Sequence, residues 1–222
     1  MKVTCVSAAN IEMARGRSAS VRTCELIRDI ILEEPPPDIA VEIVPLLDYE
    51  LNPCRMTGEC YSTGWCERDP AFNQVFSRLI EADAIFIVCP HYAPIPSKLV
   101  MLFEKMQEMF FLHIMNDPDY IFPLNNKPVG VIGHGGQTEE ALSYYKSALL
   151  DPIATVLTSV QMKVVGANEK WPYGVAFGIK DIIHHTDSIF FTFEHDWASI
   201  RTRIKPLVIN VIRQANRSAQ AA

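Results

Sequence analysis

The sequence ADAIFIVCPHYAPIPSKLVMLFEKM, residues 82–106, decides the fold of this chain. A short apolar run at residues 84–88 ends abruptly in the turn CPHY at residues 89–92, and a helical pattern begins near Ser97. Short apolar runs bounded by turn residues are typical of strands buried in a parallel sheet. In open α/β sheets, ligands bind just beyond the carboxyl ends of such strands. A loop rich in proline and tyrosine at that place has a restricted backbone and an aromatic face, which suits a flat heteroaromatic cofactor.

Strand and helix patterns alternate along the rest of the chain. We expect strands at residues 2–7, 39–46, 84–88, 127–133 and 160–166, and helices at residues 18–34, 70–81, 97–115, 138–157 and 197–216. This alternation predicts an α/β fold with a doubly wound, five-stranded parallel sheet and helices on both faces. We expect a single domain over residues 1–222, with an irregular aromatic insertion at about residues 168–196.

Composition narrows the classes of function. The net charge is −6 and no basic stripe is visible, which argues against binding to nucleic acid or to an anionic membrane surface. The most apolar run, residues 99–115, is interrupted by Glu104, Lys105, Gln107 and Glu108, so we expect no membrane span. The chain starts directly with a strand pattern, so no secretory signal is expected. The six cysteines are then expected to be reduced thiols in the cytoplasm.

The loop SAANIEMARGRSAS, residues 7–20, connects the first expected strand to the first expected helix. Free backbone amides and the helix dipole make a helix N-terminus attractive to anions. Ser18 and Ser20 are therefore candidates to hydrogen-bond a phosphate, with Arg15 or Arg17 supplying positive charge. The alternative is an N-capping serine beside arginines in solvent. The loop is not a Walker loop, because it lacks the terminal Gly-Lys-Ser/Thr.

A third loop, GHGGQ at residues 133–137, follows the fourth expected strand. Its glycines allow the backbone to approach a ligand closely, although a plain strand-to-helix turn explains this loop equally well when it is taken alone. Loops at residues 7–20, 89–97 and 133–137 follow three strands of one expected sheet. Because the carboxyl ends of parallel strands meet at one edge, the three loops together favour a single ligand site.

The order of the elements and the motifs CPHYAPIPSKLVMLFEKM and GHGGQTEEAL resemble the NADPH-dependent FMN reductase family of flavodoxin-like proteins, and within it the iron–sulfur flavoprotein branch. The resemblance covers about residues 1–167 and implies FMN as cofactor and NAD(P)H as co-substrate. It departs from the family at Ala8-Ala9, where Gly-Ser is usual, and at Cys89, where Ser is usual.

The resemblance also assigns the three loops to parts of FMN. It implies that Arg17, Ser18 and Ser20 hold the phosphate, and Ser7 and Arg15 are counted with them as cofactor-binding residues. The residues expected to line one side of the isoalloxazine are Pro90, His91, Tyr92, Ala93 and Ile95. Those expected to approach its other edge are Gly133, Gly135 and Gly136.

A cysteine loop lies between the second expected strand and the next helix. In PCRMTGECYSTGWCERD, residues 53–69, Cys54, Cys60 and Cys66 match the first, third and fourth cluster cysteines of iron–sulfur flavoproteins, and Thr57 stands at the second position. Cubane clusters are normally held by four thiolates, so we expect no metal here. A cluster completed by another ligand, a zinc site and a dithiol–disulfide pair remain alternatives to an ancestral loop that retains three thiols.

Two segments carry more apolar surface than a core requires. The helix expected at residues 97–115 is rich in Met and Phe beyond one stripe, which favours a homodimer or a dimer of dimers over core packing alone. The aromatic segment at residues 171–197 either covers the flavin or forms a packed insertion or dimer arm. The pairs His184-His185 and His195-Asp196 fit no established metal-ligand spacing.

The leading hypothesis is an FMN-containing, NAD(P)H-dependent oxidoreductase that reduces a quinone, another flavin or a small electrophile. The cofactor performs the hydride chemistry, while the protein supplies binding, orientation and electrostatics. His91 and His134 lie on the flavin-facing loops and are candidate catalytic residues, because imidazole exchanges protons near neutral pH. The alternatives are an electron carrier that serves protein partners without turning over a small substrate, and a flavodoxin-like interaction module without cofactor.

Overall fold

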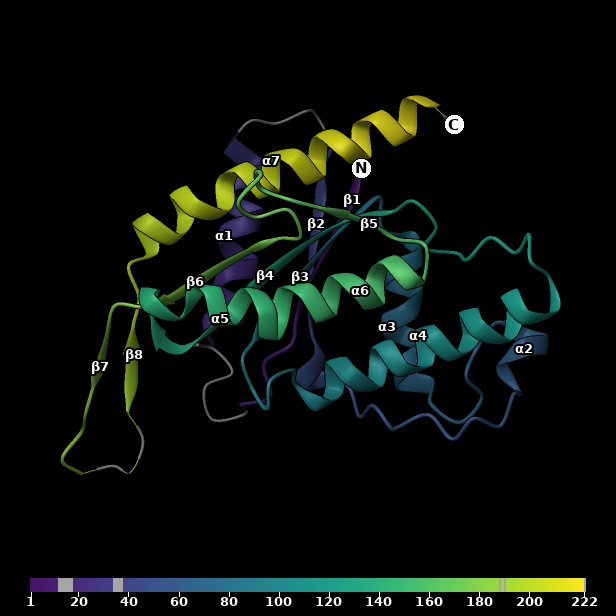
Figure 1. Ribbon diagram of the computed structural model, residues 1–222, viewed down its shortest axis with the longest axis horizontal. Helices are drawn as coiled ribbons and strands as arrows, with labels where there is room; N and C mark the ends of the chain where they lie inside the picture. The colour runs from purple at the N-terminus through teal and green to yellow at the C-terminus, as the bar shows by residue number, and fades with distance from the viewer. Residues whose placement is uncertain (12–17, 34–37, 188, 190, 222) are drawn as a thin grey trace.

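A parallel sheet lies at the centre of the computed structural model, which describes residues 1–11, 18–33, 38–187, 189 and 191–221 (Figure 1). Its strand order is β2-β1-β3-β4-β5. The bounds are β1 (Lys2–Ser7), β2 (Ala40–Pro45), β3 (Ala84–Pro90), β4 (Pro128–Thr138) and β5 (Lys163–Val165). All of these neighbours pair in parallel. The structure therefore confirms the predicted flavodoxin-like α/β fold.

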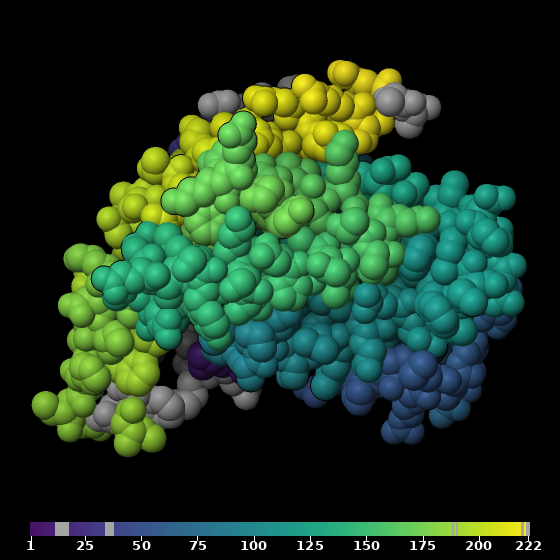
Figure 2. Space-filling model, in the orientation of Figure 1, coloured from purple at the N-terminus to yellow at the C-terminus, as the bar shows by residue number. Residues whose placement is uncertain are grey.

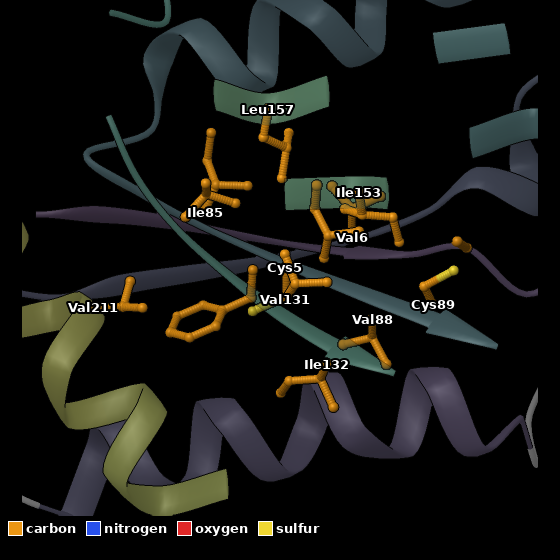
Figure 3. Packing of buried hydrophobic residues seen from close by; sticks show 14 of the residues in the cluster. Cys5, Val6, Ile85, Val88, Cys89, Val131, Ile132, Ile153, Leu157 and Val211 are labelled. Carbon is orange, nitrogen blue, oxygen red and sulfur yellow. The ribbon is translucent and has the colours of Figure 1, made fainter. Parts of the chain in front are cut away.

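Helices cover both faces of the sheet. One face is covered by α1 (Ala19–Glu33) and α7 (Trp197–Ala221), and the other by α3 (Pro70–Glu81), α4 (Ser97–Asn116) and α6 (Asp151–Ser159). Figure 3 shows Ile153 and Leu157 of α6 on one side of the sheet and Val211 of α7 on the other. Every residue of β3 is buried, as expected for a strand covered on both faces.

Short helical segments complete the described elements. They are η2 (Leu46–Asp48), α2 (Cys60–Thr63), η3 (Glu139–Ala141), α5 (Leu142–Tyr145) and the π-helical turn η4 (Lys146–Leu150). The best-defined helix start is that of α3, where the Asp69 carboxylate accepts a hydrogen bond of 2.9 Å from Phe72 N–H and Pro70 occupies the first turn. No helix in the described part of the chain is long and apolar enough to cross a membrane.

The glycine segment at residues 133–137, expected to be a loop, is the end of β4. The strand continues because β6 (Val175–Ile179) pairs with it in parallel beyond the point where β5 stops. The helix expected at residues 138–157 consequently starts later, as α5, and reaches α6 through the π-helical turn.

The segment at residues 168–196, expected to be irregular, contains three strands. The first, β6, belongs to the central sheet, with Val175 beside Ile132 and Phe177 beside His134. The other two, β7 (Asp181–Ile183) and β8 (Thr192–Glu194), form an antiparallel hairpin that projects from one end of the molecule (Figures 1 and 2). We propose that residues 1–222 nonetheless form one domain, since β6 continues the main sheet.

Candidate functional site

The ends of β1, β3 and β4 lie side by side at one edge of the sheet. Ser7 is in register with Val88, and Pro90 with His134. Two backbone hydrogen bonds continue this alignment past the strands: Ala8 N–H donates to Val88 O at 2.9 Å, and His91 N–H donates to His134 O at 2.7 Å. The structure thus brings together the three loops that the sequence assigns to one site.

The first loop leaves two buried polar atoms without partners. Ser7 Oγ and Asn10 Oδ1 are both buried, and neither has a hydrogen-bond partner among the described residues. Buried polar groups are nearly always hydrogen-bonded, so an exception at a ligand-binding edge indicates a missing polar ligand. The Ser7 hydroxyl can donate to a phosphate oxygen or to a ribityl oxygen of FMN, whereas Asn10 Oδ1, which only accepts, fits a ribityl hydroxyl. The predicted ligands Arg15 and Arg17 lie outside the described residues.

Ser20 is engaged with the protein itself. Its hydroxyl lies 2.7 Å from Nε2 of His134, and both side chains are buried. The His134 ring also stacks on Phe177, with ring centroids 5.1 Å apart. A phosphate bound by Ser20 therefore has to share its hydroxyl with His134. Ser18, just before α1, is also buried, and its role as a phosphate ligand stays a prediction.

Burial keeps the His134 imidazole uncharged. Desolvation, with a smaller contribution from His195, lowers the pKa of His134 to about 3. At neutral pH the ring is an uncharged donor and acceptor that links β4 to the first turn of α1. Burial also lowers the pKa of His195, which stacks on Trp197.

The low pKa of His134 predicts loss of stability in mild acid. The unfolded chain binds a proton near pH 6.5 that the folded chain does not bind until about pH 3, so stability is complete above pH 6.5 and falls below it. At pH 5 the protonation of this one group in the unfolded chain is expected to lower the free energy of unfolding by about 2 kcal/mol. His195, whose pKa is also lowered, should decrease stability in acid as well.

The check is urea unfolding of His134→Asn at pH 7 and pH 5, with His184→Asn on the exposed hairpin as control. The free energy of unfolding should differ less between pH 7 and pH 5 in His134→Asn than in the wild type, because the asparagine amide takes up no proton. The control should show the same difference as the wild type. If His134→Asn keeps the full wild-type difference, His134 does not cause it.

The second loop, after β3, has one strained residue. Ala93 has φ +57°, in the left-handed region that costs a residue with a Cβ about 1–2 kcal/mol. Tyr92 N–H donates to Pro94 O at 2.6 Å across it. Backbone strain of this kind persists where surrounding structure enforces it, often at ligand sites. Tyr92 and Ile95 are half-buried and Ala93 is exposed, so the loop presents an accessible face.

Cys89, which replaces the family's serine, is not a reactive thiol. It is fully buried, and burial raises its pKa well above the ordinary range. Its Sγ lies 3.5 Å from Pro90 O. The thiol therefore packs in the core beneath the loop.

The glycines of β4 are packed against the protein on the side where a Cβ would stand. The side chains that occupy this space are Leu149 beside Gly133, Tyr145 beside Gly135 and Phe193 beside Gly136. Tyr145 is buried, and its Oη accepts a hydrogen bond of 2.9 Å from Gln137 N–H. A larger side chain at these positions would displace the side chains that support the edge. We propose that these glycines contact the cofactor through their backbone groups.

Three residues of this edge, Asn10, Tyr144 and Tyr145, were not predicted as site residues, and Phe177 was predicted only as part of the aromatic segment at residues 171–197. Tyr144 lies 2.9 Å from His91 Nε2, and Phe177 supports His134. The tyrosines follow the GHGGQ segment by a few residues, which was a usable signal. Phe177 reaches the site only because β6 joins the sheet, and no local pattern indicates that pairing.

The cysteine loop forms a second, separate cavity. A space of about 220 Å³ is lined by Cys54, Cys60 and Cys66 together with the buried pair Asp69 and Lys105. The three cysteines are half-buried, and burial raises the pKa of the Cys60 thiol. Over the residues that the structure describes, no three or more His, Cys, Asp and Glu side chains are grouped so that they could hold a metal ion.

The flavodoxin-like sheet places the ends of β1, β3 and β4 and two unpartnered polar atoms at its carboxyl edge, where open α/β sheets bind their ligands. The sequence profile described as NADPH-dependent FMN reductase matches residues 13–169, and the chain belongs to this family. Comparison with curated proteins gives no match.

Solved structures with the same architecture span nearly the whole chain. One is RosB with a bound 8-demethyl-8-formylriboflavin-5′-phosphate intermediate, at 15% identity and a TM-score of 0.62, covering 99% of this chain and 81% of RosB. FerB from Paracoccus denitrificans has 10% identity and a TM-score of 0.53, covering 97% of both chains. An azoreductase from Bacillus anthracis has 13% identity and a TM-score of 0.54, covering 99% of both. At these identities the likeness shows the fold alone.

Proposed function

We propose that this protein binds FMN and passes electrons from NAD(P)H to a quinone, a flavin or another small acceptor. The observation that carries the proposal is the pair of buried, unpartnered atoms Ser7 Oγ and Asn10 Oδ1 at the edge where the family binds its cofactor. The names of the structural neighbours support it: RosB holds a riboflavin-5′-phosphate derivative, FerB is a flavoenzyme NAD(P)H:(acceptor) oxidoreductase, and the third is an azoreductase.

Different residues at the carboxyl edge are proposed to contact the two ends of FMN. Ser7 and Ser18 donate to the phosphate end, together with the backbone amides that begin α1, and Asn10 Oδ1 accepts from a ribityl hydroxyl. The rigid turn from Pro90 to Ile95 and the backbone of β4 enclose the ring end. Bound FMN supplies hydride chemistry, so the protein has only to hold and orient the reactants and to exclude side reactions.

Space for an acceptor is present beside β4. A hollow of about 780 Å³ lies between the end of β4 and the root of the hairpin, with Gln137, Thr138 and His184 among its lining residues. Its lining mixes polar and apolar groups, and it includes the carboxylates Glu140 and Asp181 and the ammonium of Lys180, which is paired with Glu194 at 2.6 Å. We expect an uncharged or cationic aromatic acceptor to enter it more readily than an anionic one.

Of the two candidate catalytic histidines, His91 is better suited to move a proton. His134 is buried and its pKa is about 3, so it carries no extra proton at neutral pH. His91 is half-buried and touches an exposed phenol. We therefore propose His91 as a proton donor and His134 as the residue that positions Ser20. The test is turnover and its pH profile in His91→Ala and His134→Ala.

The function itself is tested by reconstitution. Protein stripped of ligand and titrated with FMN should quench flavin fluorescence at one site per chain, and NADPH or NADH should then bleach the flavin absorption. Ser7→Ala is expected to weaken FMN binding about 10- to 100-fold, because one hydrogen bond to a charged group contributes about 1.5–3 kcal/mol. Ser62→Ala, exposed in the cysteine loop, is the matched control. A wild-type chain that does not bind FMN would rule the proposal out.

The cysteine cavity keeps an electron carrier as the second candidate. Three thiols that line one cavity could hold an iron–sulfur cluster if a fourth ligand completed the site. Iron and sulfide analysis of protein purified without oxygen separates the two: both elements in stoichiometric amounts, with slow NAD(P)H oxidation, would favour the carrier.

We also propose a cytoplasmic homodimer or dimer of dimers. The outer face of α4 leaves Val100, Phe111 and Met115 exposed, at 46%, 54% and 67%. Apolar side chains grouped on one helix favour contact with a second copy. Light scattering of the purified chain tests the association, and a strictly monomeric mass would refute it.

A further inference from the structure

Three half-buried thiols line the cavity of the cysteine loop. Cys54, Cys60 and Cys66 border a space of about 220 Å³, which is large enough to admit a molecule of the size of hydrogen peroxide. Across the described residues, no three such side chains are arranged to hold a metal ion, so chemistry that needs two thiols suits this cavity better than a metal site. We propose that Cys54 and Cys60 are a peroxide-reactive thiol pair that closes reversibly to a disulfide.

Cys54 is the thiol positioned to react with peroxide. Its Sγ accepts a hydrogen bond of 3.4 Å from the Met56 N–H, in a tight turn where Met56 has φ +50°. The thiolate is the form of cysteine that attacks an oxidant, and a donor that faces the sulfur stabilises that anion. The backbone of Cys54 is held in place, because its N–H donates to Glu104 Oε2 on α4 at 2.9 Å.

Cys60 is the thiol suited to react second. Burial raises its pKa, and the charges of Cys54 and Cys66 raise it further, which means that Cys60 lies near both. It begins the four-residue helix α2. The segment that joins it to Cys54 has room to move, because no described atom lies within 4 Å of the position of a Cβ at Gly58.

Cys66 is anchored away from this pair by its backbone. Its N–H donates to Asn73 Oδ1 at 2.9 Å, and its carbonyl oxygen accepts a hydrogen bond of 2.9 Å from Asn73 Nδ2. Both bonds tie Cys66 to α3. An accessible thiol beside a second thiol that can resolve it is the usual arrangement of redox-sensing cysteines, and Cys54 with Cys60 fits that arrangement.

The proposed chemistry uses hydrogen peroxide as the oxidant. The Cys54 sulfur attacks one peroxide oxygen, an S–O bond forms and the O–O bond breaks, and the departing hydroxide takes the proton that the thiol released. The Cys60 sulfur then attacks the sulfenic sulfur, an S–S bond forms and the S–O bond breaks, and the second hydroxide leaves as water with the Cys60 proton. The two thiols lose two electrons and two protons, and peroxide becomes two water molecules. A dithiol reductant restores both thiols and becomes a disulfide itself.

The test is peptide mapping of reduced protein that has been treated with hydrogen peroxide and then with iodoacetamide. Trypsin cleaves after Arg55 and Arg68, so Cys54 lies on one peptide and both other cysteines of the loop on the next. The wild type is expected to lose the mass of two hydrogen atoms and to yield these two peptides joined. Fragmentation between Cys60 and Cys66 should place the bond on Cys60, and dithiothreitol should reverse it.

Serine variants separate the roles of the three thiols. Cys60→Ser should accumulate sulfenic acid on Cys54, which dimedone traps, whereas Cys54→Ser should form neither the sulfenic acid nor the disulfide. Cys66→Ser is the matched control, since it removes a third half-buried thiol of the same cavity, and it should form the disulfide as the wild type does. Circular dichroism of each variant shows that it is folded, and the wild-type map involves no substitution.

Three results would overturn the inference. They are a disulfide that includes Cys66, a folded wild type whose thiols stay free in peroxide, and stoichiometric iron and sulfide in protein purified without oxygen. This inference does not depend on the proposed function, and FMN titration of the same reduced sample keeps the two apart. A chain that forms the Cys54–Cys60 disulfide but binds no FMN loses the proposed function alone.

Discussion

Lys105→Met is expected to lower the free energy of unfolding by about 3–5 kcal/mol, the cost of leaving a buried charge without its partner. Lys105 Nζ lies 2.9 Å from Asp69 Oδ2, and the two side chains are only 4% and 2% exposed. Asp69 also caps α3 and accepts the Asn52 N–H at 2.8 Å. Removing the ammonium therefore leaves a buried carboxylate that both α3 and the cysteine loop require.

The same variant should also reverse a pH dependence. Burial alone would raise the pKa of Asp69, but hydrogen bonds from Lys105 and from the Asn52 and Phe72 amides lower it below its ordinary value. In the wild type, stability from this carboxylate is present at neutral pH and lost as pH falls through that low value. Without Lys105 the pKa of Asp69 should rise, so in the variant this buried carboxylate becomes protonated, and loses its unpaired charge, as pH falls. The loss in free energy of unfolding relative to the wild type should therefore be smaller at pH 5 than at pH 7.

Urea unfolding at the two pH values measures both effects. Lys180→Met is the matched control, because Lys180 pairs with Glu194 at 2.6 Å but both side chains are exposed, and exposed pairs contribute little. The double variant Asp69→Asn with Lys105→Met should recover part of the loss, since it removes the unpaired charge. A Lys105→Met chain as stable as Lys180→Met would mean that the buried pair does not form.

The sequence predicted correctly those helices and strands whose ends are determined by neighbouring residues in the chain. The observed β1 and α3 have the predicted bounds, residues 2–7 and 70–81, because an apolar run and a proline in the first turn define them without help from the rest of the chain. The carboxyl edge followed from the order of strands alone. The family followed from the loops at residues 89–97 and 133–137, which carry its motifs.

What the sequence could not show depends on pairing between distant segments. The Ser20 to His134 hydrogen bond joins residues 114 apart, and neither side chain's local context indicates the other. The strand β6 is five residues long, contains Gly178 and directly follows Gly174, and these glycines weaken any strand pattern. Its partner β4 was predicted to end at Gly133, so that His134 and Thr138, which also pair with β6, lay outside the predicted strand. Pairing with β6 extends β4 and places Phe177 against His134, so that β6 forms one wall of the site.

Gly174→Ala is the second change with a large expected effect, about 3–5 kcal/mol of stability from backbone strain and overpacking together. Gly174 has φ +141°, a conformation that side chains rarely adopt. A Cβ there would overlap the carbonyl oxygen of Val131 and lie 3.1 Å from its carbonyl carbon. Because that obstacle is backbone of the central strand, no rotamer change can make room, and β6 has to move away from β4.

The consequence should reach the site, because β6 carries Phe177 against His134. Gly174→Ala is expected to lose stability in urea and, at temperatures where it remains folded, to bind FMN more weakly. Gly64→Ala is the matched control: its φ is +71°, but nothing lies within 4 Å of the added Cβ, so it should cost only the conformational strain of about 1–2 kcal/mol. Hydrogen exchange of the Ile132 to His134 amides gives an independent readout, since these residues pair with β6 and should exchange faster only in Gly174→Ala. Equal losses in the two variants would show that close packing at Gly174 does not hold β6 on the sheet, and the wall of the site would then have to depend on the hairpin and α7 instead.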